Sequence, residues 1–349
     1  MILEKITIEN FRNIKNAELE PSPGVNVIYG KNGQGKTNFL EAVWLMSGAR
    51  SFRSGSFSDF INHGESFSRL RAVAGENRIE LRLADKREIF LNEIKITDYT
   101  ELLERFCAVV FAPNHLSLIK DSPARRRRFL DQLLCEQSFE YFDNLRTYER
   151  LLQQRNSLLK DARFVGGALQ LIESYDERLA QCGEKIIEYR TALVDGINLR
   201  VPELYNKISG EDEKISFKYN KNIENDLFDE LKRSFNNDLV MKTTGKGPHR
   251  DDVTIEINGR SAKLFGSQGQ QRSIIIALKL FNSELLEKKT GEKPVIILDD
   301  VLSELDFERQ QQILSNFAEK QIFISCCDST HIKLNRETKL IKMEEGRLI

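Results

Sequence analysis

The chain has 349 residues, 30% of them charged and 40% hydrophobic, which is long enough for two lobes and typical of a soluble globular protein with a buried core. Its 52 basic and 53 acidic residues give a net charge of −1, so no whole-chain field attracts a polyanion, and any contact with nucleic acid must come from a local patch. No apolar run approaches the roughly 18 residues of a membrane span, the charged N-terminus is unlike a signal peptide, and the five cysteines form no CxxC pair, so secretion, membrane insertion and structural zinc are not expected and the protein is expected in the cytoplasm.

Two N-terminal segments predict the start of an α/β fold. Residues 2–8 alternate between apolar and polar side chains and are expected to form an edge strand. A second strand, residues 25–29, runs directly into a GxxxxGK[ST] phosphate loop, and helical periodicity follows over residues 39–44. The loop residues, all expected to contact ATP, are Gly30, Lys31, Asn32, Gly33, Gln34, Gly35, Lys36 and Thr37.

The chemistry of this loop is specific to phosphate. Its glycines let successive backbone N–H groups turn inward around an anion, and the following helix N-terminus adds partial positive charge. We expect Lys36 to reach the β- and γ-phosphates and the Thr37 hydroxyl to ligate Mg²⁺. The alternative is a glycine-rich turn before an ordinary helix, which the complete motif in its strand–loop–helix context makes improbable.

A late acidic strand completes the expected nucleotide site. Residues 295–298 form a continuous apolar run, as in a buried parallel strand, and end in Asp299 and Asp300. We expect Asp299 to hold Mg²⁺ and Asp300 to polarise an attacking water. Alone, the pattern also fits a strand with an acidic turn. The number of residues between the phosphate loop and this strand far exceeds that of one βαβ unit, so a large insertion must separate the two halves of the expected site.

Two further segments resemble motifs of ABC-type ATPases. Ser267-Gln-Gly269-Gln-Gln precedes a helical run and resembles the signature motif, and residues 303–306 resemble the D-loop. In that class the signature helix points at the γ-phosphate of the opposite protomer, so the resemblance implies that Ser267 and Gly269 act in trans, with Asp306 as a further catalytic residue. An ordinary capped helix start is the alternative for the signature segment.

The middle of the chain predicts a helical arm. Two heptad seams, residues 141–159 and 172–193, flank a Gly-Gly break at 164–167 that suits a hairpin turn. Arg155 is expected to interrupt the first seam. The pattern predicts two antiparallel helices of roughly 45 Å at most. After Gly210, alternation over residues 215–219 predicts a strand that returns towards the head.

Together the segments resemble the RecF family of bacterial recombination mediators, relatives of the SMC-type chromosome proteins, over nearly the whole chain. The resemblance implies an α/β fold, an ABC-type P-loop ATPase head with an inserted helical arm that is a short antiparallel coiled coil. It also implies that Arg12 and Asn13, at the end of the first strand, contact the nucleotide. The domains expected are residues 1–120 and 241–349 for the head and 121–240 for the arm. The segments that carry the resemblance are residues 10–13, 35–42, 50–53, 122–131, 247–252 and 298–306.

The chain also departs from the family and its relatives at two places. Asn114 and His115 stand where the family usually carries acidic residues, and residues 325–327 read Ser-Cys-Cys without the switch histidine of transporters. His331 lies too far along to assume that role.

The resemblance further implies an ATP-dependent homodimer that binds double-stranded DNA and single-strand/double-strand junctions. It implies work with RecO and RecR to place RecA on single strands. Asp300 is one methylene shorter than the glutamate of many ABC enzymes, which predicts slow, switch-like ATP hydrolysis. The run Arg125, Arg126, Arg127 and Arg128, and then Lys242 and Lys246, are the candidate contacts to the DNA backbone. Such a run is often only a solvated face.

Four other function classes are the alternatives, and the sequence fits each of them less well. An SMC-like structural DNA tether needs hundreds of heptad residues, and an abortive-infection-type ABC ATPase needs a further acidic domain after the D-loop. A transporter subunit needs a switch histidine, and a small-molecule phosphotransferase has no use for the signature segment.

Overall fold

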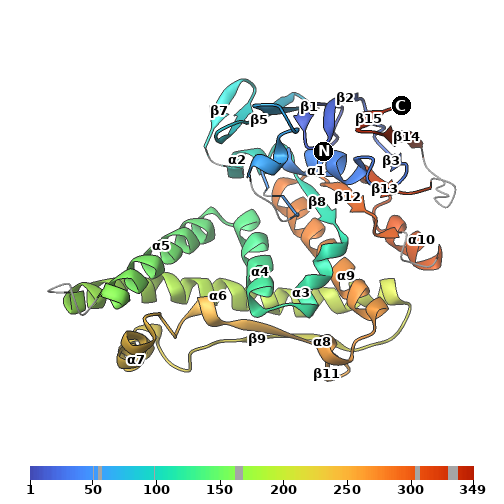
Figure 1. The fold of residues 1–349 in the computed structure, drawn as a ribbon. Helices are drawn as coiled ribbons and strands as arrows, with labels where there is room; N and C mark the ends of the chain where they lie inside the picture. Colours follow the sequence, from blue (N-terminus) through green and yellow to red (C-terminus); the bar gives the residue numbers. More distant parts are fainter. Residues whose placement is uncertain (50, 54–56, 98, 162–167, 303–306, 329–336) are drawn as a thin grey trace. The chain divides into compact units, whose positions relative to one another are not determined.

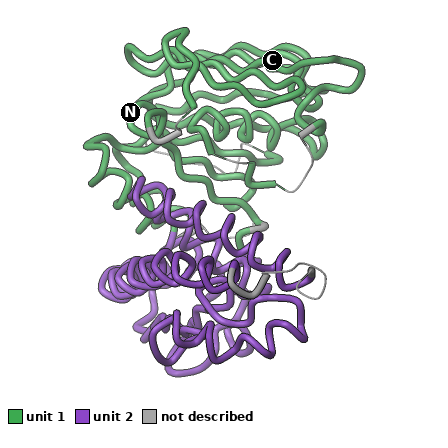
Figure 2. The backbone as a smooth tube through the Cα atoms, turned by 90° about the vertical axis from the view of Figure 1, so that its left-hand side faces the viewer, with its two compact units in different colours: residues 1–115, 279–349 green, residues 116–278 purple. Residues whose placement is uncertain are grey.

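The computed structural model of the chain describes residues 1–349 apart from 50, 54–56, 98, 162–167, 303–306 and 329–336. The chain divides into two compact units, which Figure 2 colours separately. Unit 1 comprises residues 1–115 and 279–349, and unit 2 comprises residues 116–278. Within the described residues, no helix is long and apolar enough to cross a membrane.

The units differ from the predicted domain boundaries at two segments. The shorter one is residues 116–120, which were expected in the N-terminal part of the head and lie in unit 2. Residues 241–278 were expected in the C-terminal part of the head, but they belong to unit 2. The reason is strand pairing: β10 (Asp252–Ile257) is hydrogen-bonded to β9 (Ile215–Asn220) on one side and to β11 (Arg260–Ser261) on the other. The strand predicted after Gly210 is therefore confirmed as β9, and it pairs within unit 2.

The first sheet of unit 1 is mixed and carries the predicted nucleotide-binding strands. Its order is β15-β14-β3-β13-β12-β8, and all its pairings are parallel except that of β14 with β15. The strands predicted around residues 25–29 and 295–298 are confirmed as β3 and β12. The six strands are β3 (Val25–Tyr29), β8 (Ala108–Phe111), β12 (Val295–Asp299), β13 (Ile322–Cys326), β14 (Thr338–Glu344) and β15 (Arg347–Leu348).

The second sheet of unit 1 is antiparallel and has the order β2-β1-β4-β5-β6-β7. β1 lies between β2 and β4, so the prediction of an edge strand near the N-terminus is wrong. Alternation shows which side chains face the core, but it does not show whether a strand has one neighbour or two. The six strands are β1 (Lys5–Phe11), β2 (Ile14–Leu19), β4 (Ser68–Ala74), β5 (Asn77–Leu83), β6 (Arg87–Leu91) and β7 (Ile94–Ile96).

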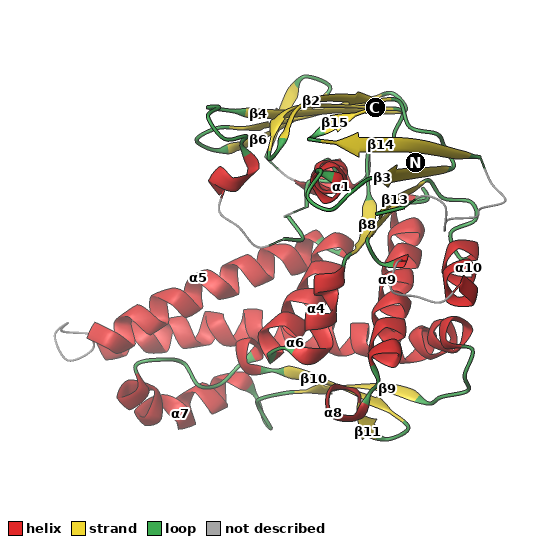
Figure 3. Ribbon diagram, turned by 45° about the vertical axis from the view of Figure 1, so that its right-hand side comes forward, coloured by secondary structure: helices red, strands yellow, loops and turns green. Residues whose placement is uncertain are grey.

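Helix α1 (Lys36–Leu45) lies between the two sheets of unit 1 (Figure 3). Its side chains Phe39 and Leu40 share one apolar core with Ile8 of β1 and Ile297 of β12. This burial fixes the first turn of α1, and hence the loop before it, relative to both sheets. The other helical elements of the unit are α2 (Tyr99–Leu103), α10 (Phe307–Ser315), the C-terminal part of α9 (Gln268–Thr290), and the 3₁₀ turns η1 (Phe57–Phe60) and η2 (Pro113–Leu116), which ends at the boundary with unit 2.

Unit 2 is built on the predicted helical arm. Helix α5 (Phe139–Asp161) packs antiparallel along α6 (Ala168–Ser209), which Figure 1 shows. With 42 residues, α6 is about 63 Å long, so the predicted limit of roughly 45 Å is too short for it. The predicted turn at 164–167 lies outside the described residues. The remaining elements are α3 (Ser117–Lys120), α4 (Pro123–Gln137), α7 (Leu227–Met241), η3 (Pro248–Arg250), α8 (Ala262–Phe265) and the first residues of α9.

Arg155, the charged residue that interrupts the apolar heptad pattern of α5, is completely buried. Its Nε donates to Asp176 on α6 at 2.5 Å, and its Nη1 donates to Asp238 on α7 at 2.8 Å and to the Thr244 hydroxyl at 2.9 Å. Asp238 is also completely buried and accepts the backbone N–H of Gly245. This network, Arg155–Asp176–Asp238–Thr244, joins three helices to the segment that leads into η3.

Candidate functional site

The predicted phosphate loop follows β3 and leads into α1. Two of its glycines occupy positions that a side chain would strain: φ is +148° at Gly30 and +112° at Gly35. A Cβ at Gly30 would strike the carbonyl oxygen of Met343, and one at Gly35 would come within 2.8 Å of Asn13 Oδ1. The close approach of other segments therefore requires glycine at both ends of the loop.

The loop is also held from the C-terminal hairpin. The backbone N–H of Gly346 donates to the carbonyl of Gln34 at 2.9 Å, and the N–H of Glu345 donates to the Gln34 side chain at 2.6 Å. Within the loop, Lys36 Nζ donates to the carbonyls of Gly30 at 2.6 Å and Lys31 at 2.9 Å. An ammonium group has three protons, so Lys36 keeps one for a further acceptor.

Asp299, at the end of β12, lies directly beside the loop. Its Oδ1 accepts hydrogen bonds from the Thr37 hydroxyl at 2.9 Å and from the Ser325 hydroxyl at 2.8 Å. Burial raises the pKa of Asp299, while these two hydrogen bonds oppose the rise. The structure thus brings together the two residues predicted to hold Mg²⁺, which lie at opposite ends of the sequence.

The oxygen pair of Thr37 and Asp299 fits Mg²⁺ chemically. Mg²⁺ is a hard cation that takes oxygen ligands, typically one or two protein oxygens with phosphate oxygens and water. A hydroxyl and a carboxylate within hydrogen-bond distance, beside a loop shaped for phosphate, supply that donor set. The residues present therefore fit a Mg²⁺-nucleotide complex.

Asp300 follows Asp299 and has a φ of +50°. This left-handed conformation is uncommon for non-glycine residues, although aspartate tolerates it better than most. Its backbone N–H donates to the Ser325 hydroxyl at 2.9 Å. The side chain predicted to polarise water thus starts from a turn in the backbone at the carboxyl end of β12.

Arg12 and Asn13, which the resemblance implies as nucleotide contacts, are held against α1. Arg12 forms a two-pronged ion pair with the completely buried carboxylate of Glu41, through Nε at 2.5 Å and Nη2 at 2.8 Å. Asn13 accepts a hydrogen bond from Asn38 at 2.7 Å, and Arg53 donates to the Asn38 side-chain oxygen at 2.6 Å. Contact of Arg12 and Asn13 with a nucleotide stays a prediction.

The sequence assigned no role to Glu41 or Ser325. A carboxylate on the otherwise apolar core side of α1 is the signal that could have identified Glu41, since a buried charge requires a partner. Ser325 is harder to identify from the sequence, because only the strand register shows that it lies beside Asp299.

The signature residues Ser267 and Gly269 lie in unit 2, at the start of α9. Gln270 N–H donates to the Ser267 hydroxyl at 3.1 Å, and Ser267 N–H donates to the Gln270 side chain at 2.8 Å. This reciprocal pair caps the helix N-terminus and leaves Ser267 exposed. The predicted D-loop, residues 303–306 with Asp306, lies outside the described residues.

The arginine run opens α4, and its four side chains have different surroundings. Arg126 is buried and forms a two-pronged ion pair with Asp252, at 2.7 and 3.0 Å. Arg127 donates to the Asp251 carbonyl at 2.6 Å. Arg125 and Arg128 are exposed. The prediction that the whole run meets DNA is therefore wrong for Arg126, whose charge is neutralised inside unit 2.

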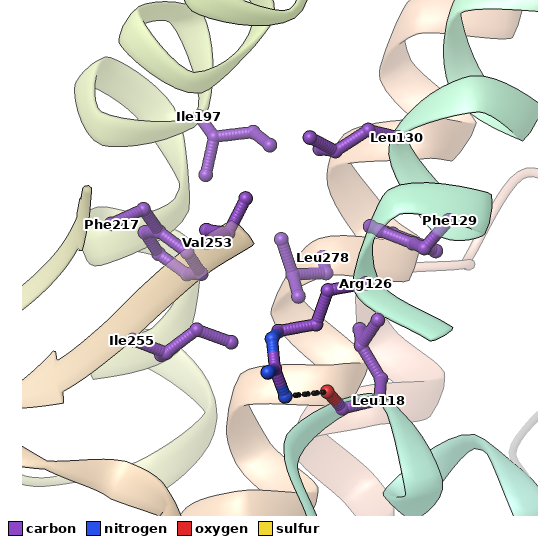
Figure 4. A pocket seen from close by; sticks show the side chains of 9 residues that line it. All are labelled: Leu118, Arg126, Phe129, Leu130, Ile197, Phe217, Val253, Ile255 and Leu278. Atoms are coloured by element: carbon purple, nitrogen blue, oxygen red, sulfur yellow. Dashed lines mark hydrogen bonds between the residues drawn. The ribbon is translucent and has the colours of Figure 1, made fainter. Parts of the chain in front are cut away.

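Arg126 also borders a small apolar cavity of unit 2, shown in Figure 4. The guanidinium group turns away towards the carbonyl of Leu118, and the lining includes Leu130, Ile197 and Val253. With a volume of about 20 Å³, the cavity holds at most a water-sized molecule. It is a packing defect rather than a ligand site.

The two sequence segments most specific to the family resemblance, residues 122–131 and 247–252, contact each other. Besides the Arg126–Asp252 pair, Arg190 connects them, with an ion pair to Asp131 at 2.7 Å and a hydrogen bond to the Pro248 carbonyl at 2.8 Å. These charges therefore connect the two segments within unit 2.

The two lysines predicted as further DNA contacts lie near this region. Lys246 pairs with Glu230 at 3.3 Å, and Lys242 is exposed at the end of α7.

Comparison with known proteins gives consistent matches over the full length. Residues 2–349 match the family described as RecF/RecN/SMC N terminal domain. The DNA replication and repair protein RecF of Trichlorobacter lovleyi is 36% identical, over all of this chain and 98% of the relative. A solved structure of the recombination mediator protein RecF-ATP in the RecFOR pathway is 35% identical, with a TM-score of 0.91 over all of this chain and 97% of that one. The Smc head domain of Pyrococcus furiosus, 16% identical over 99% of this chain and 95% of that one with a TM-score of 0.56, shares the fold alone.

Proposed function

The chain belongs to the RecF family, and on this premise we propose that it is an ATP-dependent DNA-binding clamp of recombinational repair. The observation that carries the proposal is the 2.9 Å hydrogen bond between Thr37 of the phosphate loop and Asp299 of β12. It joins the two halves of a nucleotide site across the whole insertion. The similar RecF structure with ATP supports ATP as the nucleotide.

Within unit 1, each residue of the site has a defined task. Lys36 binds the β- and γ-phosphates, and Thr37 and Asp299 would hold Mg²⁺, which would neutralise charge on the phosphates. Asp300 polarises the water that attacks the γ-phosphate. Because its side chain is one methylene shorter than glutamate, it positions that water less closely, and hydrolysis is slow enough to time a clamp.

The clamp closes by dimerisation. The capped N-terminus of α9, with Ser267 and Gly269, meets the γ-phosphate bound by a second copy of the chain, and Asp306 contributes from the D-loop. ATP then joins two protomers, and hydrolysis separates them. The exposure of Ser267 supports a contact with another molecule.

The closed dimer binds double-stranded DNA and single-strand/double-strand junctions in the cytoplasm, in association with the nucleoid. It acts with RecO and RecR to load RecA on single-stranded DNA. Arg125, Arg128 and Lys242 are the exposed candidates among the predicted cations, and they contact phosphates rather than bases. An SMC-like structural tether fits less well, because α5 spans only 23 residues.

The test compares DNA footprints on gapped and blunt duplexes, with and without ATP. The native protein is expected to protect the gap junction only with ATP. Lys36→Met removes the counterion of the phosphates and should abolish ATP binding, dimerisation and this protection, whereas Lys15→Met, at an exposed position of β2, should change none of them. If Lys36→Met still dimerises with ATP, the site is wrongly assigned.

A further inference from the structure

We propose that Ser325 is a positioning residue that holds Asp299 and Asp300 in the arrangement required for Mg²⁺ and for the attacking water. This inference rests on the proposed function. Ser325 lies on β13, is 2% exposed, and is the direct cross-strand partner of Asp299. Its hydroxyl O–H donates to Asp299 Oδ1 at 2.8 Å, and its oxygen accepts a hydrogen bond from the backbone N–H of Asp300 at 2.9 Å.

The two hydrogen bonds determine each other's direction. A serine hydroxyl has a single proton and two lone pairs. Since the Asp300 N–H can only donate, it occupies a lone pair of Ser325 and leaves the proton to Asp299. One buried side chain therefore connects the carboxylate that would hold Mg²⁺ to the backbone that carries the next carboxylate.

The backbone at Asp300 needs this acceptor. β12 ends at Asp299, and the chain leaves the sheet at Asp300 with a φ of +50°. A partly buried N–H that has left the sheet ladder needs another acceptor, and the hydroxyl of Ser325 supplies it. Without it, the turn that aims the Asp300 side chain loses its anchor on β13.

Ser325 also fixes Asp299 independently of the phosphate loop. Oδ1 of Asp299 accepts from both Thr37 and Ser325. If the Thr37 hydroxyl were engaged by Mg²⁺, the Ser325 hydrogen bond would still hold the orientation of the Asp299 carboxylate. The role therefore concerns the metal-dependent part of nucleotide binding and the chemical step, more than the binding of nucleotide without metal.

The experiment measures ATP affinity by isothermal titration calorimetry in Mg²⁺ and in EDTA, together with kcat and KM for hydrolysis. For Ser325→Ala, loss of a hydrogen bond to a charged group should reduce the gain in affinity on adding Mg²⁺ by about tenfold or more. The affinity in EDTA should stay near native, and kcat should fall more than KM rises. Ser325→Thr, which keeps the hydroxyl, should restore both.

Two controls separate this role from packing. Ser325→Val has the shape of Ser325→Thr without the hydroxyl, so this pair decides the question even if Ser325→Ala fails to fold. Ser47→Ala removes another buried serine of unit 1, which donates to the Trp44 carbonyl, and should behave as native. In an Asp299→Asn background, Ser325→Ala should cause little additional loss of the Mg²⁺ effect, because its partner is already altered.

The outcomes are distinct. A native protein whose ATP affinity does not respond to Mg²⁺ refutes the proposed function itself. If the native protein responds and Ser325→Val matches Ser325→Thr in Mg²⁺ response and kcat, the positioning role is refuted while the proposed function stands. If Ser325→Ala loses ATP affinity equally in Mg²⁺ and in EDTA, the positioning role is also refuted.

Discussion

Replacing Arg155 by methionine tests the buried network of the arm. The change keeps the length and packing of the side chain but leaves Asp176 and Asp238, which are 3% and 0% exposed, without their cation. Removing one partner of a buried ion pair costs about 3–5 kcal/mol. For a unit of this size, about 2–4 °C per kcal/mol gives a fall in melting temperature of about 6–20 °C.

The loss of unfolding free energy caused by Arg155→Met should also depend on pH. Burial raises the pKa of Asp176, and the ion pair with Arg155 opposes that rise. Without Arg155 the pKa rises further, so the folded variant takes up a proton more readily than the unfolded chain. A group whose pKa is raised on folding contributes stability below that pKa and loses it as pH increases. The Arg155→Met penalty is therefore expected to be larger at about pH 8 than at about pH 5.

Thermal and urea unfolding, followed by circular dichroism at both pH values, measure these effects. Arg150→Met, at an exposed position of the same helix, is the matched control and should lie within about 0.5 kcal/mol of native. Arg155→Lys keeps the charge without the planar fork and should fall between the two. A loss no larger than that of Arg150→Met would show that the network does not stabilise the arm.

Three further predictions concern the interfaces and unit 2. Ser267→Arg should leave ATP binding by the monomer intact but block ATP-driven dimerisation, as measured by analytical ultracentrifugation. If the variant monomer no longer binds ATP, the signature segment acts on the nucleotide of its own protomer. The double variant Arg125→Ala/Arg128→Ala should weaken duplex binding and reduce the slope of log binding constant against log salt concentration by about 0.9 per lost phosphate contact. Arg126→Ala should instead lower the unfolding temperature of unit 2. Burial lowers the pKa of His249 from 6.5 to about 4, so the unfolded chain takes up a proton on this histidine at a higher pH than the folded protein does. The free energy of unfolding should therefore fall as pH falls from 6.5 towards 4. In His249→Gln, the urea midpoint should depend less on pH over this range.

The meeting of the phosphate loop with Asp299 could be predicted from the sequence because each segment is a local motif with a recognisable composition. Lys36 and Thr37 belong to a loop whose residue types follow from phosphate binding, and Asp299 ends an apolar run that only a buried strand explains. The structure adds the distance between them. The seam of α5 and α6 was likewise visible, since seven-residue periodicity is a property of the helix itself.

The sequence could not show which side chains the buried charges pair with. A run of four arginines has the same appearance whether its members face water or, like Arg126, are buried and paired with a carboxylate on a strand more than a hundred residues away. Arg155 seemed to break a hydrophobic pattern only because Asp176 and Asp238 were not known to converge on it. Charges inside a fold can be recognised as paired only once the topology is known.

The interruption of unit 1 by unit 2 has a consequence for synthesis on the ribosome. β3 is made early, but its two sheet neighbours, β13 and β14, follow only after all of unit 2 has been made. At bacterial rates of translation, the delay between Tyr29 and Ile322 is about 15–60 s. During this time β3 and β8 have unpaired edges, which favour mispairing with other chains. The nascent N-terminal segment is therefore the part of this protein that most needs a chaperone, and slower translation of unit 2 should increase aggregation.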